Sequence, residues 1–242
     1  MSISVVKRDG AVVPIDVFKI KKVIAFGCDG YDCDALELEM DAHVQFRDRI
    51  TTEEIQKMVI QTAVEKISHE DPQWEFVAGK LFLYDIYKKV CLHRKLDKKP
   101  YTRFYEFIQM ATEKKLYSSA ILETYSREEI DELAAYMVPD RDYQFKYVGI
   151  KTLTDRYLIK DGDGKILELP QEAFMGIAMF LASKEKDRLH WAKEFYDVIS
   201  KFEVIPATPT LSNARKPLHQ LSSCFVGTVD DSLDSIFDFV TT

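Results

Sequence analysis

The sequence predicts an α+β fold in which a short β-hairpin is followed mainly by helices. Two β-branched runs, residues 3–6 and 11–15, are joined by a turn that contains Asp-Gly, which is a strong hairpin signal. Most of the following segments have apolar residues at the helical period. Near residue 160 a second pair of strand-like runs surrounds a glycine-rich turn. These three observations together predict the α+β class.

The first 95 residues are predicted to form one unit of a hairpin and several helices. Asp16 is placed as the N-cap of a short helix over residues 17–24, which ends at Gly27. Asp34 begins a second periodic segment that continues to Val44.

Two longer helices complete this unit. Thr51 and Glu54 have the spacing of a capping box, and a helix from about Glu53 to Ile67 follows. Asp71-Pro72 opens another helix, because proline is tolerated in a first helical turn, and its apolar period continues to about Lys95.

A helical linker region is predicted for residues 96–150. The charged residues 95–99 and Pro100 interrupt the apolar period, so a short linker is placed there. Helices are expected again near residues 102–114 and 127–137, the second with Ser126 as its N-cap.

The last predicted region, residues 151–242, mixes strands and helices. Its hairpin consists of residues 156–160 and 165–169, and the helix that begins at Pro170 is apolar on most sides, which indicates burial. That helix covers residues 171–183, and the segments expected after it are a helix over 187–201, a strand over 202–205, an extended loop over 206–210 and a strand over 221–229.

Composition limits the classes of protein that this chain can represent. With 242 residues, 46% hydrophobic and 12% aromatic, the chain can fill a packed core, so disorder of the whole chain is excluded. Charged residues near the N-terminus and the lack of a long apolar run predict a cytoplasmic protein without a membrane partner. The net charge of -7 disfavours nonspecific binding to nucleic acid.

The four cysteines are sparse and irregularly spaced, which is typical of cytosolic thiols and not of a disulfide scaffold. They are Cys28, Cys33, Cys91 and Cys224. Only the first two are close in sequence, and no second pair would complete four zinc ligands, so no metal site is predicted.

Positive charge gathers near the first predicted helix. Lys7 and Arg8 occupy the hairpin turn, and Lys19 and Lys22 follow on the helix. Helix N-termini and cations favour phosphate, so a nucleoside triphosphate site is one interpretation and a solvated basic surface is the other.

The order of these elements resembles the ATP-cone regulatory domain over about residues 3–92. The resemblance includes the KRDG hairpin, Pro14-Ile15-Asp16, Ile50-Thr51-Thr52 and the final helix with Tyr87-Lys88-Lys89. It implies binding of ATP or dATP as an allosteric effector, with Mg²⁺, and no tightly bound organic cofactor. The residues to which it assigns this site are Lys7, Arg8, Val13, Asp16, Lys19, Thr52 and Lys88.

Two of these positions depart from some members of that family. Val13 replaces a polar hairpin residue and can offer only backbone or apolar contact. Gln56 stands where a histidine can occur.

A second motif lies around Cys224. A lone cysteine is often a buried structural residue, and that is the alternative interpretation here. However, the segments PATPTLSN at 206–213, QLSSCF at 220–225 and DSLDSI at 231–236 resemble the start of the catalytic barrel of the ribonucleotide reductase large subunit. Together with the ATP cone, this indicates a class I enzyme.

The resemblance implies a fold and a set of roles. Residues 1–95 would form the ATP cone, residues 96–150 a helical linker domain, and residues 151–242 the first part of a ten-stranded α/β barrel. Cys224 would be one of the redox pair, Thr208 and Ser223 would contact the substrate nucleotide, and Asp231, Ser232 and Leu233 would open the specificity-effector site.

No cysteine follows Cys224, so its disulfide partner is expected on another polypeptide or on a missing C-terminal part, and this chain alone is expected to be inactive. The implied partners are the C-terminal part of the large subunit, a second large subunit, a radical-generating small subunit, and thioredoxin or glutaredoxin. Two alternatives remain at this point: a stand-alone nucleotide-sensing and docking module, and a transcription regulator with an ATP cone.

Overall fold

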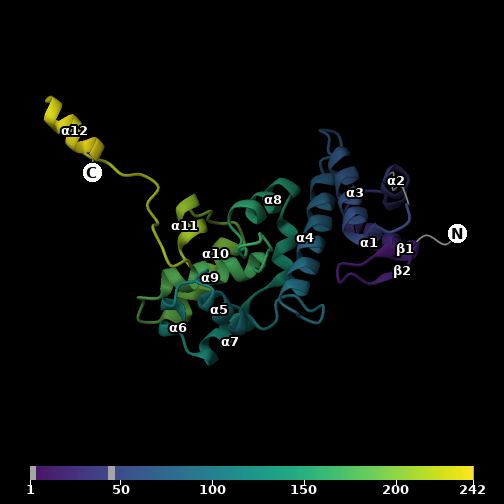
Figure 1. The fold of residues 1–242 in the computed structure, drawn as a ribbon, viewed down its shortest axis with the longest axis horizontal. Coiled ribbons are helices and arrows are strands. Elements are labelled where there is room, and N and C mark those ends of the chain that lie inside the picture. The colour runs from purple at the N-terminus through teal and green to yellow at the C-terminus, as the bar shows by residue number, and fades with distance from the viewer. Residues whose placement is uncertain (1–3, 43–46, 242) are drawn as a thin grey trace.

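The computed structural model describes residues 4–42 and 47–241. A three-stranded sheet in the order β2-β1-β3 lies near the N-terminus (Figure 1). β1 (Ser4–Val6) pairs antiparallel with β2 (Val12–Pro14), and Val5 faces Val13 across the pair. The turn between them contains Gly10 at φ 85°, a backbone conformation that glycine adopts without a steric penalty. The predicted first hairpin is therefore confirmed.

The third strand was not predicted. β3 (Ile50–Thr51) pairs parallel with β1, so that Val5 lies beside Ile50. Two residues are too few to show a period of two in the sequence, and the pairing depends on a contact between segments 45 residues apart. Thr51 is also the N-cap of the next helix, where it forms the predicted capping box with Glu54.

Four helices pack beside this sheet. They are α1 (Val17–Cys28), α2 (Ala35–Asp41), α3 (Thr52–Glu65) and α4 (Trp74–His93). Each corresponds to a predicted helical segment, although Val44, the predicted end of the second, lies outside the described residues. Asp34 caps α2 by accepting a hydrogen bond from the backbone N–H of Leu36 at 2.8 Å.

Asp16 differs from its predicted role as a side-chain cap. It has the extended backbone of an N-cap residue, but its carboxylate makes no capping hydrogen bond. That carboxylate lies 3.3 Å from the Lys19 ammonium, so an ion pair one turn away takes the place of the cap.

The segment after α4 changes direction repeatedly, as the predicted linker requires. Lys95, Asp97, Lys98, Tyr101 and Arg103 all have positive φ values, which are incompatible with a continued helix. The helical elements that follow are α5 (Phe104–Glu113), α6 (Ala120–Thr124), α7 (Arg127–Tyr136), the 3₁₀-helix η1 (Pro139–Gln144), α8 (Tyr147–Arg156), α9 (Pro170–Ala182), α10 (Arg188–Ser200), α11 (Thr208–Asn213) and α12 (Leu233–Thr241).

The predicted strands beyond residue 150 are wrong for the described chain. The second hairpin is reduced to a single bridge between Lys160 and Ile166 around the glycine-rich turn. Residues 202–205 and 221–229 form no strand, and residues 208–213 are helical, since Pro209 is tolerated in a first turn. A strand is stable only beside a hydrogen-bonding neighbour, and the described residues place none along 221–229.

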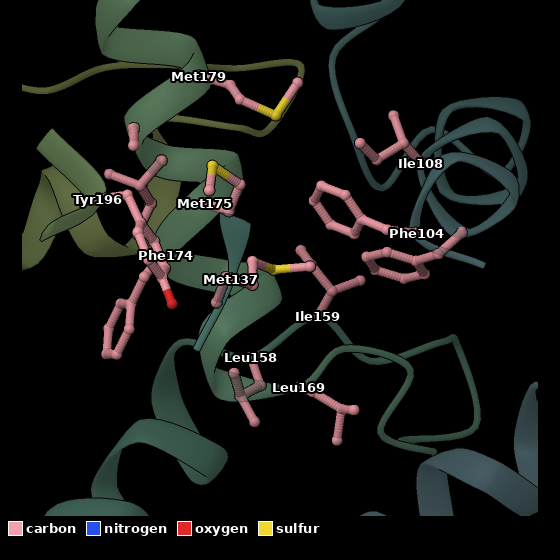
Figure 2. Packing of buried hydrophobic residues seen from close by; sticks show 14 of the residues in the cluster. Phe104, Ile108, Met137, Leu158, Ile159, Leu169, Phe174, Met175, Met179 and Tyr196 are labelled. Carbon is pink, nitrogen blue, oxygen red and sulfur yellow. The ribbon is translucent and has the colours of Figure 1, made fainter. Parts of the chain in front are cut away.

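Helix α4 contributes to two hydrophobic clusters. Leu81 packs with α1, α2 and α3, whereas Leu83, Ile86 and Val90 pack with the helices from α5 onward. Figure 1 shows α4 between these two groups of elements. In the second cluster, Met175 and Met179 of α9 lie among residues of α5 and of the loop before α9 (Figure 2).

The architecture is thus a small sheet with a helix-rich body. This agrees with the predicted α+β class and with the predicted hairpin-plus-helix unit and helical region. The described residues contain no strand of a catalytic barrel. The predicted division into residues 1–95, 96–150 and 151–242 stays a prediction, and its second boundary falls inside α8. Among the described residues, no helix is long and apolar enough to cross a bilayer.

Candidate functional site: a basic cavity between the hairpin and helix α4

A cavity of about 730 Å³ opens between the hairpin, the starts of α1 and α3, and the C-terminal half of α4. Its wall contains all seven residues predicted to bind nucleotide. They are Lys7, Arg8, Val13, Asp16, Lys19, Thr52 and Lys88. The fold therefore brings together side chains from four segments of the sequence, the most distant of them more than eighty residues apart.

Local structure explains how these side chains reach the cavity. The tight turn of the hairpin presents Lys7 and Arg8, while Thr52 is the first residue of α3 and lies at the positive end of that helix. Lys88 lies on α4 across from the turn, in reach of the Arg8 charge. The first residue of α3 and cations from two other elements thus line the same cavity.

Apolar side chains form much of the remaining wall. Ile15, Ile20, Ile55, Val59 and Tyr84 line the cavity beside the cations. Gln56 also lines it, but its amide N–H donates to the backbone carbonyl of Leu81 at 3.2 Å. One of the two amide N–H donors of Gln56 is therefore occupied, which leaves the second N–H and the oxygen for other contacts.

Arg8 is held by an acidic residue of α4. Its guanidinium forms an ion pair with the Asp85 carboxylate and also donates to the Asp85 backbone carbonyl at 3.5 Å. The Asp85 side chain is only 7% exposed. Its other oxygen lies 2.9 Å from the Lys89 ammonium, which in turn lies 2.7 Å from Glu53. Four alternating charges thus form a chain from the hairpin across α4 to α3.

Lys88 differs from these residues because it makes no ion pair in the part of the chain that the structure describes. Its ammonium lies 3.9 Å from the centre of the Tyr84 ring. Burial and, to a smaller extent, the Arg8 charge lower the pKa of Lys88 from its ordinary value of 10.5 to about 8, with Asp85 acting in the opposite direction. Lys88 is therefore a partly desolvated cation whose charge an anion in the cavity would stabilise.

The sequence reasoning missed Asp85, Lys89 and Tyr84. A signal was present, because Tyr84, Asp85 and Lys88 lie at helical spacings of three and four residues on one helix. What the sequence did not show is that the hairpin turn packs against this face of α4. Lys7 and Lys19 also line the cavity, and both are exposed.

The residues predicted around Cys224 are not gathered into a site by the described chain. Thr208 begins α11, and its hydroxyl lies 3.3 Å from the Tyr157 hydroxyl. Ser223 and Cys224 are exposed neighbours, with Oγ and Sγ 3.8 Å apart.

Asp231, Ser232 and Leu233 lie at the start of α12, where the Ser232 hydroxyl accepts a hydrogen bond from the backbone N–H of Ser235 at 3.2 Å. All three are exposed. In Figure 1, α12 lies apart from the other helices at the end of an extended segment. Within the described ranges, no cluster of three or more His, Cys, Asp or Glu side chains is arranged to hold a metal ion.

Comparison with known proteins identifies two domains in the chain. Residues 3–89 match the ATP cone domain, and residues 143–219 match the all-alpha domain of ribonucleotide reductase. The first match covers the cavity from the hairpin to Lys88.

Three relatives that match most of this chain are each named as an alpha subunit of ribonucleoside-diphosphate reductase. A ribonucleoside-diphosphate reductase subunit alpha from Helicobacter pylori is 47% identical over 237 residues, which are 98% of this chain and 29% of that protein. The subunit alpha from Treponema pallidum is 44% identical over 86% of this chain and 24% of its own length. The reductase 1 subunit alpha from Escherichia coli is 32% identical over 96% of this chain and 30% of its own length.

This chain therefore spans about 30% of the length of the curated relatives that it matches. The relatives do not favour the alternative of a stand-alone nucleotide-sensing module.

Proposed function

Because this chain belongs to the ribonucleoside-diphosphate reductase alpha-subunit family and contains its ATP cone, we propose that residues 1–95 bind ATP or dATP as an allosteric effector. The observation that carries the proposal is the cavity of about 730 Å³ whose wall contains the seven residues named from sequence. Its size suits a nucleotide, because pockets for ligands of this kind have volumes of about 300 to 1,000 Å³.

The two kinds of wall match the two parts of the ligand. Lys7, Arg8 and Lys88 would contact the triphosphate, with Mg²⁺ accompanying it, since cations and a helix N-terminus favour phosphate oxygens. The apolar side chains of Ile15, Ile20 and Tyr84 would contact the base and sugar. The cations would contact phosphate groups, which all nucleoside triphosphates share. Selectivity for adenine is therefore assigned to the apolar side chains of the cavity wall.

Calorimetry with ATP tests this site on the chain of 242 residues. Each charge-assisted hydrogen bond contributes about 1.5 to 3 kcal/mol, so Lys7→Ala or Lys88→Ala should weaken binding by about tenfold or more. Lys186→Ala is the matched control, because Lys186 is exposed, lies on the helical body and does not line the cavity. Unchanged ATP affinity in both cavity variants would remove the assignment.

We propose further that the protein to which this chain belongs reduces ribonucleoside diphosphates by radical chemistry, with ATP and dATP acting through different states of the assembly. In that assembly Cys224 would belong to the redox pair, Thr208 and Ser223 would contact substrate, and residues 231–233 would contribute to the specificity-effector site. A second alpha subunit, a radical-generating small subunit, and thioredoxin or glutaredoxin would be its partners.

The exposed thiol of Cys224 is consistent with exchange through a disulfide, which requires access to a second sulfur. In the reconstituted complex, Cys224→Ser should abolish multiple turnover and leave ATP binding unchanged, because the two sites share no residue. Full turnover by this variant would contradict the catalytic role.

A further inference from the structure

We propose that Asp85 is an internal placeholder for phosphate: its carboxylate occupies Arg8 in the ligand-free cavity and gives up the guanidinium when a triphosphate binds. This inference rests on the proposed function of the cavity and concerns how that site is regulated from within. The observation behind it is the buried pair between Arg8 on the hairpin and Asp85 on α4.

Asp85 and a phosphate group compete for the same donors of Arg8. A carboxylate and a phosphate offer a guanidinium similar acceptors, and both can bind its planar N–H groups in pairs. In this structure the two terminal nitrogens of Arg8 face the side chain and the backbone carbonyl of Asp85. These are the donors that a phosphate would use, so Asp85 and phosphate compete for them.

Lys89 reduces the cost of separating Arg8 from Asp85. Removing one partner from a buried ion pair is costly when the other is left as an uncompensated charge. Asp85 would not be left in that state, because its second oxygen lies 2.9 Å from Lys89. Lys89 also contacts Glu53 at 2.7 Å and is thereby fixed beside Asp85. The carboxylate can therefore release Arg8 and keep a cation.

The guanidinium of Arg8 is not fully satisfied by its contact with Asp85. Its Nε atom is buried and has no hydrogen-bond partner among the described residues. The pair with Asp85 thus leaves one donor of the guanidinium unsatisfied, which is unfavourable in a buried position. A triphosphate, with several oxygens, can satisfy more of the Arg8 donors than Asp85 does, and this difference favours the exchange.

The substitution Asp85→Asn tests the placeholder. It keeps the size of the side chain and removes the charge that competes for Arg8, so ATP binding should become about fivefold tighter. Calorimetry at about pH 6.5 keeps Lys88 protonated in all variants and separates this effect from the titration of that lysine. The same gain is expected with inorganic tripolyphosphate, because the exchange concerns phosphate only.

Two further variants distinguish competition for Arg8 from a general change in charge. Glu53→Gln removes one negative charge from the same chain of charges without contacting Arg8, and it should alter the affinity by less than about twofold. In an Arg8→Gln background, Asp85→Asn should likewise have less than about a twofold effect. Asp85→Glu keeps a carboxylate at this position. Its affinity for ATP should therefore be closer to that of the unmodified chain than to that of Asp85→Asn.

The outcomes separate this inference from the proposed function. If the unmodified chain binds ATP but Asp85→Asn does not bind it more tightly, the placeholder is wrong and the nucleotide site stands. An equal gain in the Arg8→Gln background, or a gain with ATP but not with tripolyphosphate, also contradicts the placeholder. If the unmodified chain binds neither ATP nor tripolyphosphate, the proposed function fails and the placeholder fails with it.

Discussion

Among the cavity lysines, Lys88 has an environment that places its titration near neutral pH. Its ammonium is desolvated beside the Tyr84 ring and close to the Arg8 charge, with Asp85 as the opposing anion. These surroundings lower its pKa from 10.5 to about 8. The charge of Lys88 therefore depends on pH over a range that solution experiments reach easily.

This shift predicts the pH dependence of ATP binding. Phosphate stabilises the ammonium and raises its pKa, so binding takes up a proton when Lys88 is neutral. The affinity should be nearly constant below about pH 7 and fall by up to about tenfold per pH unit above about pH 8.

Calorimetry in buffers of different ionisation enthalpy measures the proton uptake directly. Lys88→Arg is the control, because a guanidinium stays charged throughout this range and its profile should be flat. A profile for the unmodified chain that is as flat as that of Lys88→Arg would contradict the role given to this lysine.

At the scale of elements, a buried ion pair attaches the end of α11 to the start of α9. Arg215 and Glu168 are both fully buried, with Nε of Arg215 2.7 Å from one carboxylate oxygen. Arg215 also donates to the backbone carbonyls of Leu211 and Tyr157, each at 2.8 Å, and the Tyr117 hydroxyl donates to Glu168 at 2.5 Å. A single arginine thus connects the segments that contain Glu168, Leu211 and Tyr157.

We expect Arg215→Met to lower the free energy of unfolding by about 3 to 5 kcal/mol, because it leaves Glu168 buried without a cation. The double variant Glu168→Met/Arg215→Met should recover part of that loss, since neither charge then remains unpaired. Urea unfolding measures both.

The exposed pair of Lys165 and Asp163, at 3.0 Å, provides the comparison. Lys165→Ala should change the stability by less than about 0.5 kcal/mol, because solvent screens exposed pairs. Equal losses for Arg215→Met and Lys165→Ala would show that burial of the first pair has no special consequence.

At the scale of the whole molecule, the buried Asp142 connects the cavity wall to the helical body. Its carboxylate accepts hydrogen bonds from Tyr87 of α4 at 2.6 Å, from Tyr101, and from Gln171 of α9 at 2.7 Å. Tyr87 also lines the nucleotide cavity. Burial raises the pKa of Asp142 from 3.8 to about 6, although its three donors act in the opposite direction.

The raised pKa predicts how stability depends on pH. Between about pH 4 and pH 6 the folded chain binds a proton at Asp142 that the unfolded chain has released. The contribution of this group is therefore fully present below its unfolded pKa and is lost as the pH rises through about 6.

Urea unfolding of the unmodified chain and of Asp142→Asn at about pH 4.5 and pH 7 tests this sign, since asparagine does not titrate. The stability of the unmodified chain relative to the variant should fall between the two pH values. A difference that is independent of pH would contradict the assignment, whatever the absolute stability of the variant.

Much of the fold and of the candidate cavity could be predicted from local patterns. The hairpin turn at Gly10, the capping box at Thr51, the N-cap Ser126 and the apolar run of α9 each depend on residues close in sequence, and each is present in the structure. The resemblance of residues 3–92 likewise named seven positions that line one cavity. Local propensity and spacing were enough for the hairpin, the helix caps and α9, whereas the seven cavity positions were implied by the family resemblance.

Other features were decided only by tertiary structure. The β1–β3 pairing, the Arg8–Asp85 pair and the hydrogen bonds to Asp142 join residues that are 29 to 77 positions apart in the sequence. The strands predicted over 202–205 and 221–229 failed for the same reason, because a strand depends on a hydrogen-bonding neighbour that its own sequence does not specify. The sequence by itself determined the hairpin, most of the longer helices up to residue 200 and where positive charge gathers, whereas the helices α8 and α11 were not predicted. Tertiary packing decided which acidic residue faces Arg8, and with it the charge balance of the cavity, because ion pairs depend on distance in space and not along the chain.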